Sequence, residues 1–211
     1  MKKILILAAL ALALPTAVFA FSSIDYGNTG GTLAASNTVC SLPTPSCVLM
    51  LSGSALTSIT GMPGGTPLTG SNLGSVSFTT GLLTSGSLAN GGTFAAGGTF
   101  TITGNGMNGA PSGAIFTGTF TGATWTLVSH TDGTHSYIFT GMLTGKTASG
   151  FVSTGSTTVQ LTVSTGLGFF NGSVGVSSGD TNIVVPEPGS LVLLGTGLIG
   201  LAGVVRRKLK A

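Results

Sequence analysis

The sequence predicts an all-β protein whose single domain is a Gly/Ser/Thr-rich sandwich of jelly-roll type, flanked by two apolar end segments. Apolar and Ser/Thr residues alternate with period two in seven short runs, in which β-branched and aromatic types dominate. Gly-rich turns separate these runs roughly every ten residues, and no helical stripe appears between residues 20 and 189. Seven or more short strands with such turns are typical of a β-sandwich.

Charge is scarce and lies mainly at the two ends. The chain has 211 residues, of which 36 are Gly and 5% are charged, against about a quarter charged in ordinary soluble domains. Between residues 21 and 185 there are three acids, Asp25, Asp132 and Asp180, and one base, Lys146, so this part has a net charge of −2. The net charge of +3 therefore belongs to the ends and indicates no nucleic-acid surface. With so few ionisable groups, we expect no enzyme, no cofactor and no metal site.

The first 20 residues have the three-part layout of a secretory signal peptide. A basic Met-Lys-Lys start precedes an apolar run over 4–14, and the small residues Val18 and Ala20 occupy the −3 and −1 positions. The apolar run is shorter than the roughly 20 residues that span a bilayer. We expect export through the secretion translocon with cleavage after Ala20; the alternative is a buried N-terminal helix.

Residues 21–182 are expected to form one domain, since about 160 residues is a usual domain size. The predicted strands cover residues 75–79, 99–103, 114–120, 124–128, 136–140, 158–163 and 173–176. The predicted Gly-rich turns fall at 90–92, 97–98 and 105–109.

The clearest hairpin spans residues 124–140 around Asp132 and Gly133, which suit a type I′ turn of two residues. Such a turn pairs His130 with His135 and Leu127 with Ile138. The resulting faces are Trp125, Leu127 and Ile138 on one side, and Val128, Tyr137 and Phe139 on the other. Because both faces would be apolar, we expect a central hairpin with a core role.

Cys40 and Cys47 are the chain's two cysteines, and two prolines lie between them. In an exported protein this spacing predicts a disulfide that closes a short loop. Metal binding is the weaker alternative because no His lies nearby.

Three short patterns resemble chemical sites. The Gly-x-Ser-x-Gly pattern around Ser177 lacks the downstream His of a nucleophile elbow, and Lys146 follows Gly145 without the spacing of a phosphate loop. His130, Asp132 and His135 could bind a divalent ion if the imidazoles paired across the hairpin. The alternative is an exposed hairpin tip with a turn-forming Asp.

The C-terminal segment, residues 183–211, has three ordered parts. Pro186, Glu187 and Pro188 form an extended, helix-breaking tripeptide. An uncharged run over 190–205 follows, long enough as a helix to cross the membrane with help at both interfaces. The basic run over 206–210, with Arg206, Arg207 and Lys208 as the topological stop, should stay in the cytoplasm. The alternative is that this segment is a membrane anchor without a sorting function.

This arrangement resembles the PEP-CTERM sorting signal of Gram-negative bacteria, over residues 183–211 alone. The resemblance implies that an integral-membrane exosortase recognises Pro186, Glu187 and Pro188 and processes the chain during export. It also implies a membrane-anchored precursor and delivery to the cell surface or extracellular matrix, in company with exopolysaccharide.

We therefore expect an exported structural protein of the envelope or biofilm matrix, with no enzymatic activity. The alternative is a carbohydrate-binding or adhesion module on the same scaffold. It would use exposed aromatics such as Trp125 or Tyr137, although the ordinary place for Trp125 is the core.

Overall fold

A computed structural model describes residues 22–37, 40, 47–62, 65–150 and 152–185. These residues form strands and turns, with no helix among them. The strands are β1 (Ser22–Thr29), β2 (Thr32–Ala35), β3 (Leu49–Thr60), β4 (Leu68–Thr80), β5 (Leu83–Ser87), β6 (Gly91–Phe94), β7 (Gly97–Asn105), β8 (Ser112–Ser129), β9 (His135–Thr147), β10 (Val152–Gly166) and β11 (Ser173–Val185). The all-β prediction is confirmed.

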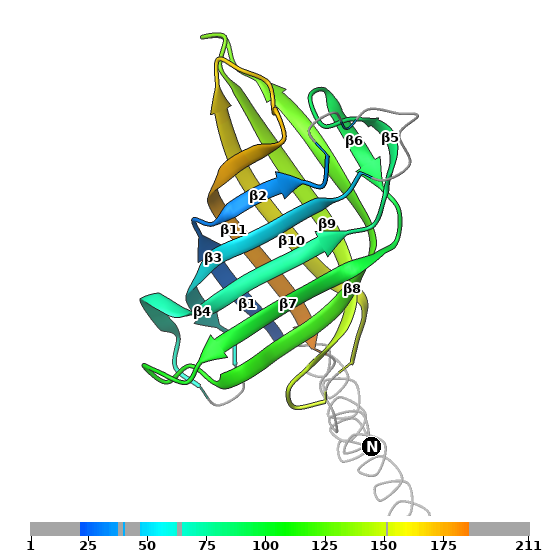
Figure 1. Ribbon diagram of the computed structural model, residues 1–211. Coiled ribbons are helices and arrows are strands. Elements are labelled where there is room, and N and C mark those ends of the chain that lie inside the picture. Colours follow the sequence, from blue (N-terminus) through cyan, green and yellow to red (C-terminus); the bar gives the residue numbers. More distant parts are fainter. Residues whose placement is uncertain (1–21, 38–39, 41–46, 63–64, 151, 186–211) are drawn as a thin grey trace, which may run out of the picture. The chain divides into compact units, whose positions relative to one another are not determined.

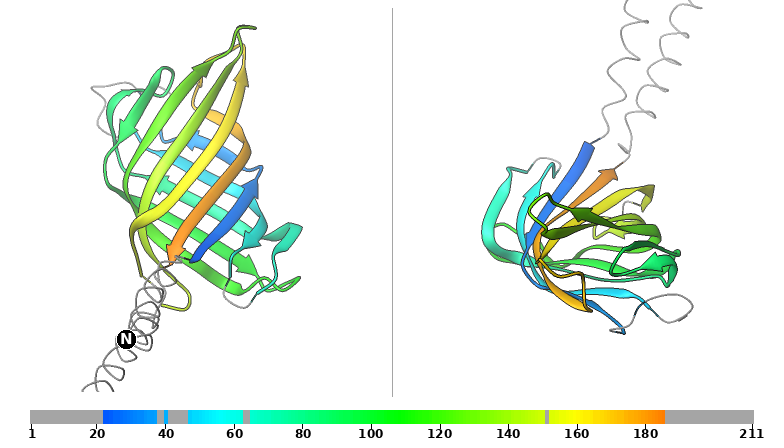
Figure 2. Two further views of the ribbon diagram at one scale, coloured as in Figure 1. Left: turned by 180° about the vertical axis from the view of Figure 1, so that it is seen from behind. Right: turned by 90° about the horizontal axis from the view of Figure 1, so that it is seen from above.

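Eight of these strands close into a barrel, where the sequence analysis expected a two-sheet sandwich. Their order is β8-β7-β4-β3-β1-β11-β10-β9, and β9 pairs back with β8 (Figure 1). Closure joins the two ends of the domain, because β1 and β11 are neighbours; Figure 2 shows them side by side in blue and orange. A closed barrel leaves no free edge among these eight strands.

The remaining three strands extend the barrel beyond sharp bends. β2 follows β1 after Gly30 and Gly31, both at positive φ, and pairs with β11 and β3. β5 follows β4 after Gly81, and β6 leads into β7, so that β5 and β6 form a hairpin that pairs with β8. Glycines at such positions allow the strands of a barrel to bend sharply.

Aromatic rings fill the barrel interior. Phe78 lies at the centre of the cluster, 5.1 Å from the Phe139 ring and 5.5 Å from the Phe120 ring between centroids. Glycine makes room for this packing: a Cβ added at Gly141 would lie 2.5 Å from Phe120 Cε1. Glycines placed against aromatic rings explain how a sequence so rich in glycine can still form a densely packed core.

The β8–β9 hairpin differs from its predicted register by one residue. Ser129, and not His130, lies opposite His135, and Trp125 lies opposite Phe139. The turn is not type I′: Gly133 N donates to His130 O over 3.1 Å, and Gly133 has φ 81°. This is a type I turn followed by a left-handed glycine, which makes a longer loop.

Because side chains alternate, the one-residue shift exchanges the predicted faces. Trp125, Tyr137 and Phe139 point together into the core, whereas Ile138 lies on the opposite face and is half-buried. The expected core role of the hairpin is correct, but the predicted division of its residues between two faces is wrong.

Candidate functional site

The two ends of the barrel differ, and we call them proximal and distal. β1 begins and β11 ends at the proximal end, at the bottom of Figure 1. The distal end carries the β8–β9 turn, the β5–β6 turn and the loop over residues 167–172 between β10 and β11. The predicted binding aromatics, Trp125 and Tyr137, lie beneath this distal end.

Trp125 and Tyr137 act as anchors for the distal segments. Their rings stack at 4.7 Å between centroids. Trp125 Nε1 donates to Leu88 O over 2.8 Å and Tyr137 Oη donates to Ala89 O over 2.6 Å, which fixes the β5–β6 turn. Trp125 is 1% exposed and Tyr137 is 0% exposed. The core position expected for Trp125 is confirmed, and the alternative of a sugar site on these two rings is wrong because neither ring is accessible.

The disulfide lies at the same end and holds the segments on either side of it against β5. Cys40 and Cys47 are joined, as predicted. Cys40 O accepts a hydrogen bond from Leu88 N over 3.2 Å, and Cys47 O accepts one from Leu83 N over 2.8 Å. The cysteine pair therefore tethers β5 at both of its ends.

The candidate metal ligands at the β8–β9 turn do not converge. His135 Nδ1 lies 3.3 Å from Ser129 Oγ, whereas His130 Nε2 lies 3.0 Å from Ser136 Oγ. Ser136 and His135 are adjacent in a strand and point to opposite faces. Asp132 Oδ1 accepts hydrogen bonds from Thr134 N and Oγ1, so this carboxylate caps the turn. Within the described residues no three His, Cys, Asp or Glu side chains are grouped as metal ligands.

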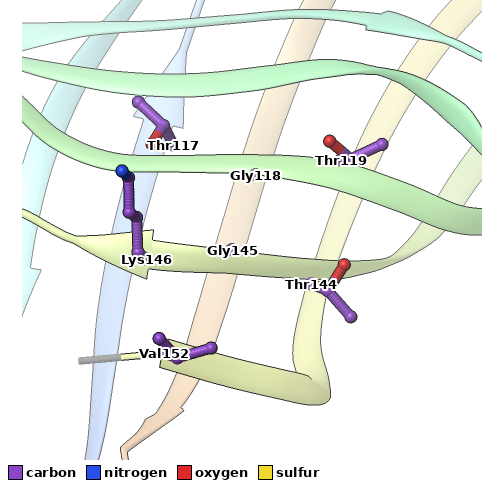
Figure 3. A pocket seen from close by; sticks show the side chains of 7 residues that line it. All are labelled: Thr117, Gly118, Thr119, Thr144, Gly145, Lys146 and Val152. Atoms are coloured by element: carbon purple, nitrogen blue, oxygen red, sulfur yellow. The ribbon is translucent and has the colours of Figure 1, made fainter. Parts of the chain in front are cut away.

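Lys146 lies in a hollow on the outer wall, near the proximal end. The hollow is shallow and open to solvent, with a volume of about 410 Å³. Figure 3 shows Lys146 beside Thr117, and Thr119 facing Thr144 across β8 and β9. Lys146 belongs to a strand, with no helix in the described part of the chain to complete a phosphate loop. The hollow offers hydroxyl groups and one cation, but no general base.

Ser177 likewise occupies an exposed position in β11. A nucleophile elbow requires a strand-to-helix turn, and β11 continues past Ser177 to Val185. The Gly-x-Ser-x-Gly match therefore has no catalytic geometry.

Sequence reasoning missed a pair of carboxyl groups on the outer wall. Asp25 of β1 and Asp180 of β11 lie within hydrogen-bonding distance of each other. Partial burial, with the adjacent negative charge of Asp25 and the hydrogen bond to it as further causes, raises the pKa of Asp180 to about 6. The two residues are 155 positions apart in sequence, and only the β1–β11 closure brings them together.

The last strand ends where the predicted sorting signal begins. β11 runs to Val185, and Ile183, which the sequence analysis assigned to the signal, is fully buried in the core. The family model of the PEP-CTERM protein-sorting motif matches residues 184–208. The chain carries a PEP-CTERM sorting motif.

The PEP-CTERM match confirms the resemblance and implies an exosortase as processing partner. The match starts at residue 184, inside β11. Comparison with curated proteins and with solved structures found no match.

Several predicted positions lie outside the described residues. They are the cleavage position Ala20, the tripeptide Pro186, Glu187 and Pro188, the helix over 190–205, and the stop residues Arg206, Arg207 and Lys208. Among the residues that are described, no helix has the length and apolarity to cross a bilayer.

Proposed function

We propose that this chain is a structural protein of the cell surface or extracellular matrix, exported as a membrane-anchored precursor and processed by an exosortase. The observation that carries the proposal is the PEP-CTERM motif over residues 184–208. A signal peptide over residues 1–20 would supply translocation, and the basic residues 206–210 would hold the precursor in the membrane until processing.

The position of β11 supports processing near the tripeptide. All eleven strands are complete at Val185, one residue before Pro186. Cleavage at or after Pro186 would therefore release the whole barrel, whereas cleavage before Ile183 would remove a fully buried core residue. The end of β11 thus sets the earliest position in the chain at which cleavage would leave the barrel complete.

A non-enzymatic role is supported by where the ionisable groups lie. Asp132 is at the distal turn, Lys146 is on the wall of β9, and Asp25 pairs with Asp180 on the wall of β1 and β11. An enzyme that uses acid–base chemistry needs such groups to converge on one substrate position. A disulfide-tethered, hydroxyl-covered barrel suits a passive role beside polysaccharide.

Replacement of Pro186, Glu187 and Pro188 by three alanines tests the delivery mechanism. We expect the variant to accumulate in the inner-membrane fraction, because the exosortase would no longer recognise it, and to disappear from the extracellular fraction. The control is alanine at Ser177, Ser178 and Asn182 on β11, which leaves the tripeptide intact. Equal extracellular yields of the tripeptide variant and the wild type would contradict the proposal.

A further inference from the structure

The distal end presents an exposed aromatic ring that the core does not use. We propose that Phe169, supported by His135 and flanked by Leu167 and Asp132, is a stacking platform for a neutral pyranose ring of a polysaccharide. The inference rests on the proposed function, because it names a partner for the exported barrel.

The loop over residues 167–172 is built to hold Phe169 outward. Phe170 turns inward, where its ring packs 5.5 Å from the Trp125 ring and its N–H donates to Tyr137 Oη over 3.0 Å. Thr165 Oγ1 donates to Gly168 O over 2.6 Å and so fixes the start of the loop. With Phe170 anchored in the core, its neighbour Phe169 remains 50% exposed.

The ring of Phe169 is immobilised on one side. It stacks on the imidazole of His135 at 4.3 Å between centroids and 17° between planes. His135 is held in turn by Ser129, whose Oγ lies 3.3 Å from Nδ1. A ring that is already fixed on one face loses little conformational entropy when a ligand covers its other face.

The β8–β9 turn, which carries Asp132, lies against Leu167 of the same loop. Leu167, which is 77% exposed, lies over the β8–β9 turn, since a Cβ at Gly133 would be 3.8 Å from its Cδ2. Gly133 is the neighbour of Asp132, whose Oδ1 caps Thr134. Hydrogen bonds from Thr134 lower the pKa of Asp132, so the carboxylate is ionised at neutral pH. Asp132 is exposed, so its carboxylate can accept a further hydrogen bond from a hydroxyl.

A pyranose fits this combination of groups. One side of the sugar ring presents C–H groups that stack on the negative face of an aromatic ring, and its edge carries hydroxyl donors for a carboxylate. A small site of this kind binds one sugar weakly, with a dissociation constant on the order of 1 mM. Many repeats of one polysaccharide would raise the overall affinity through multivalency.

Other partners fit less well. Two exposed apolar side chains provide far less than the roughly 800 Å² per partner of a stable protein interface. A membrane-inserting tip is usually flanked by Lys and Arg, whereas Asp132 is the charged residue here and Lys146, the one cation between residues 22 and 185, lies near the opposite end. The anionic carboxylate also disfavours an acidic sugar.

Affinity electrophoresis of the exported protein tests the site, with gels that contain dextran, hydroxyethylcellulose, galactomannan or alginate. We expect at least one of the three neutral polysaccharides to retard the wild type. Phe169→Ala and Phe169→Leu should bind about tenfold more weakly, and Phe169→Tyr should bind like the wild type because it keeps the ring. Met142→Ala, at a position that is 51% exposed on the outer wall, is the matched control and should change nothing.

Near-ultraviolet circular dichroism from the Trp125–Tyr137 stack will show that each variant is folded. The inference is overturned if no neutral polysaccharide retards the protein, if alginate alone does, or if Phe169→Ala is retarded like the wild type. It is also overturned if Phe169→Ala instead abolishes binding to phosphatidylglycerol vesicles or self-association in sedimentation. None of these results affects the delivery test, because the Phe169 variants keep the sorting motif.

Discussion

Single polar atoms in the core of the barrel limit its stability. Thr181 on β11 is fully buried, and its hydroxyl has no hydrogen-bond partner in the described residues. Thr157 on β10 is equally buried, but its hydroxyl lies 2.6 Å from Ser153 Oγ. A buried hydroxyl without a partner costs about 1–3 kcal/mol, so the two threonines should respond oppositely to the same substitution.

We predict that Thr181→Val stabilises the barrel by about 1 kcal/mol, because valine keeps the shape of threonine and removes the unpaired hydroxyl. Thr157→Val should destabilise it by a similar amount, since Ser153 would lose its partner. Urea unfolding followed by Trp125 fluorescence measures both changes. A loss of stability in Thr181→Val would show that its hydroxyl is satisfied.

The carboxyl pair predicts a pH dependence. Asp180 has a raised pKa of about 6 in the folded barrel and its ordinary value near 3.8 when unfolded. Below both values the group is neutral in each state and costs nothing. As pH rises from about 4 to about 6, the carboxyl ionises in the unfolded chain while the folded barrel keeps it protonated, so stability falls. Because Asp180 is only partly buried and solvent screens the pair, we expect a cost of only about 1 kcal/mol.

Asp180→Asn should therefore raise the melting temperature at pH 7.5 by about 2–4 °C and leave it unchanged at pH 3.5. Asp132→Asn is the contrasting control. Its lowered pKa means that the ionised carboxylate supports the distal turn above pH 4, so this variant should be less stable at pH 7.5. Identical shifts for Asp180→Asn at both pH values would contradict the carboxyl pair.

At the scale of the elements, the local sequence was sufficient to predict the strands in which apolar and polar residues alternate strongly. It was not sufficient to predict how those strands pair, residue by residue. His-Thr-Asp-Gly-Thr-His suits either a two-residue type I′ turn or a type I turn with a left-handed glycine. The second option places Trp125, Tyr137 and Phe139 on one face, which the core requires. That grouping of large aromatics was the signal in the sequence that could have fixed the register.

Other elements left no such local signal. β1 and β3 contain Gly, Ser and Thr at most outward positions and were not among the predicted strands. Barrel closure depends on the β1–β11 pairing between the two ends of the domain, which alternation alone cannot reveal. For the same reason the Asp25–Asp180 pair and the Phe169 platform could not be predicted, whereas the disulfide could, because two cysteines allow a single pairing.

The disulfide is predicted to stabilise the barrel and to hold β5 in place through the carbonyl groups of the two cysteines. Replacing Cys40 and Cys47 by serine should lower the free energy of unfolding by about 2–3 kcal/mol, because the unfolded loop is no longer constrained. Hydrogen exchange should rise at the amides of Leu83 and Leu88, which donate to the two cysteine carbonyls. Exchange that rises evenly over all strands, with no preference for these two amides, would argue against a local tether.

At the scale of the whole molecule, the barrel over residues 23–185 is one compact unit, separate from the two end segments of the chain. The barrel begins and ends on adjacent strands at the proximal end, and the PEP-CTERM motif starts within its last strand. Removal of both end segments would therefore leave every strand in place. The distal end, with its exposed Phe169, lies at the opposite end of the barrel from Val185, where β11 ends.

The mass of the intact exported protein tests this account most directly. The full chain has a mass of 20.6 kDa. The account predicts that extracellular material begins at Phe21, ends close to Pro186 and contains the Cys40–Cys47 disulfide, while the membrane fraction holds a form that retains residues 190–210. Extracellular protein that still carries its C-terminal residues 190–210, or a product truncated before Ile183, would contradict it.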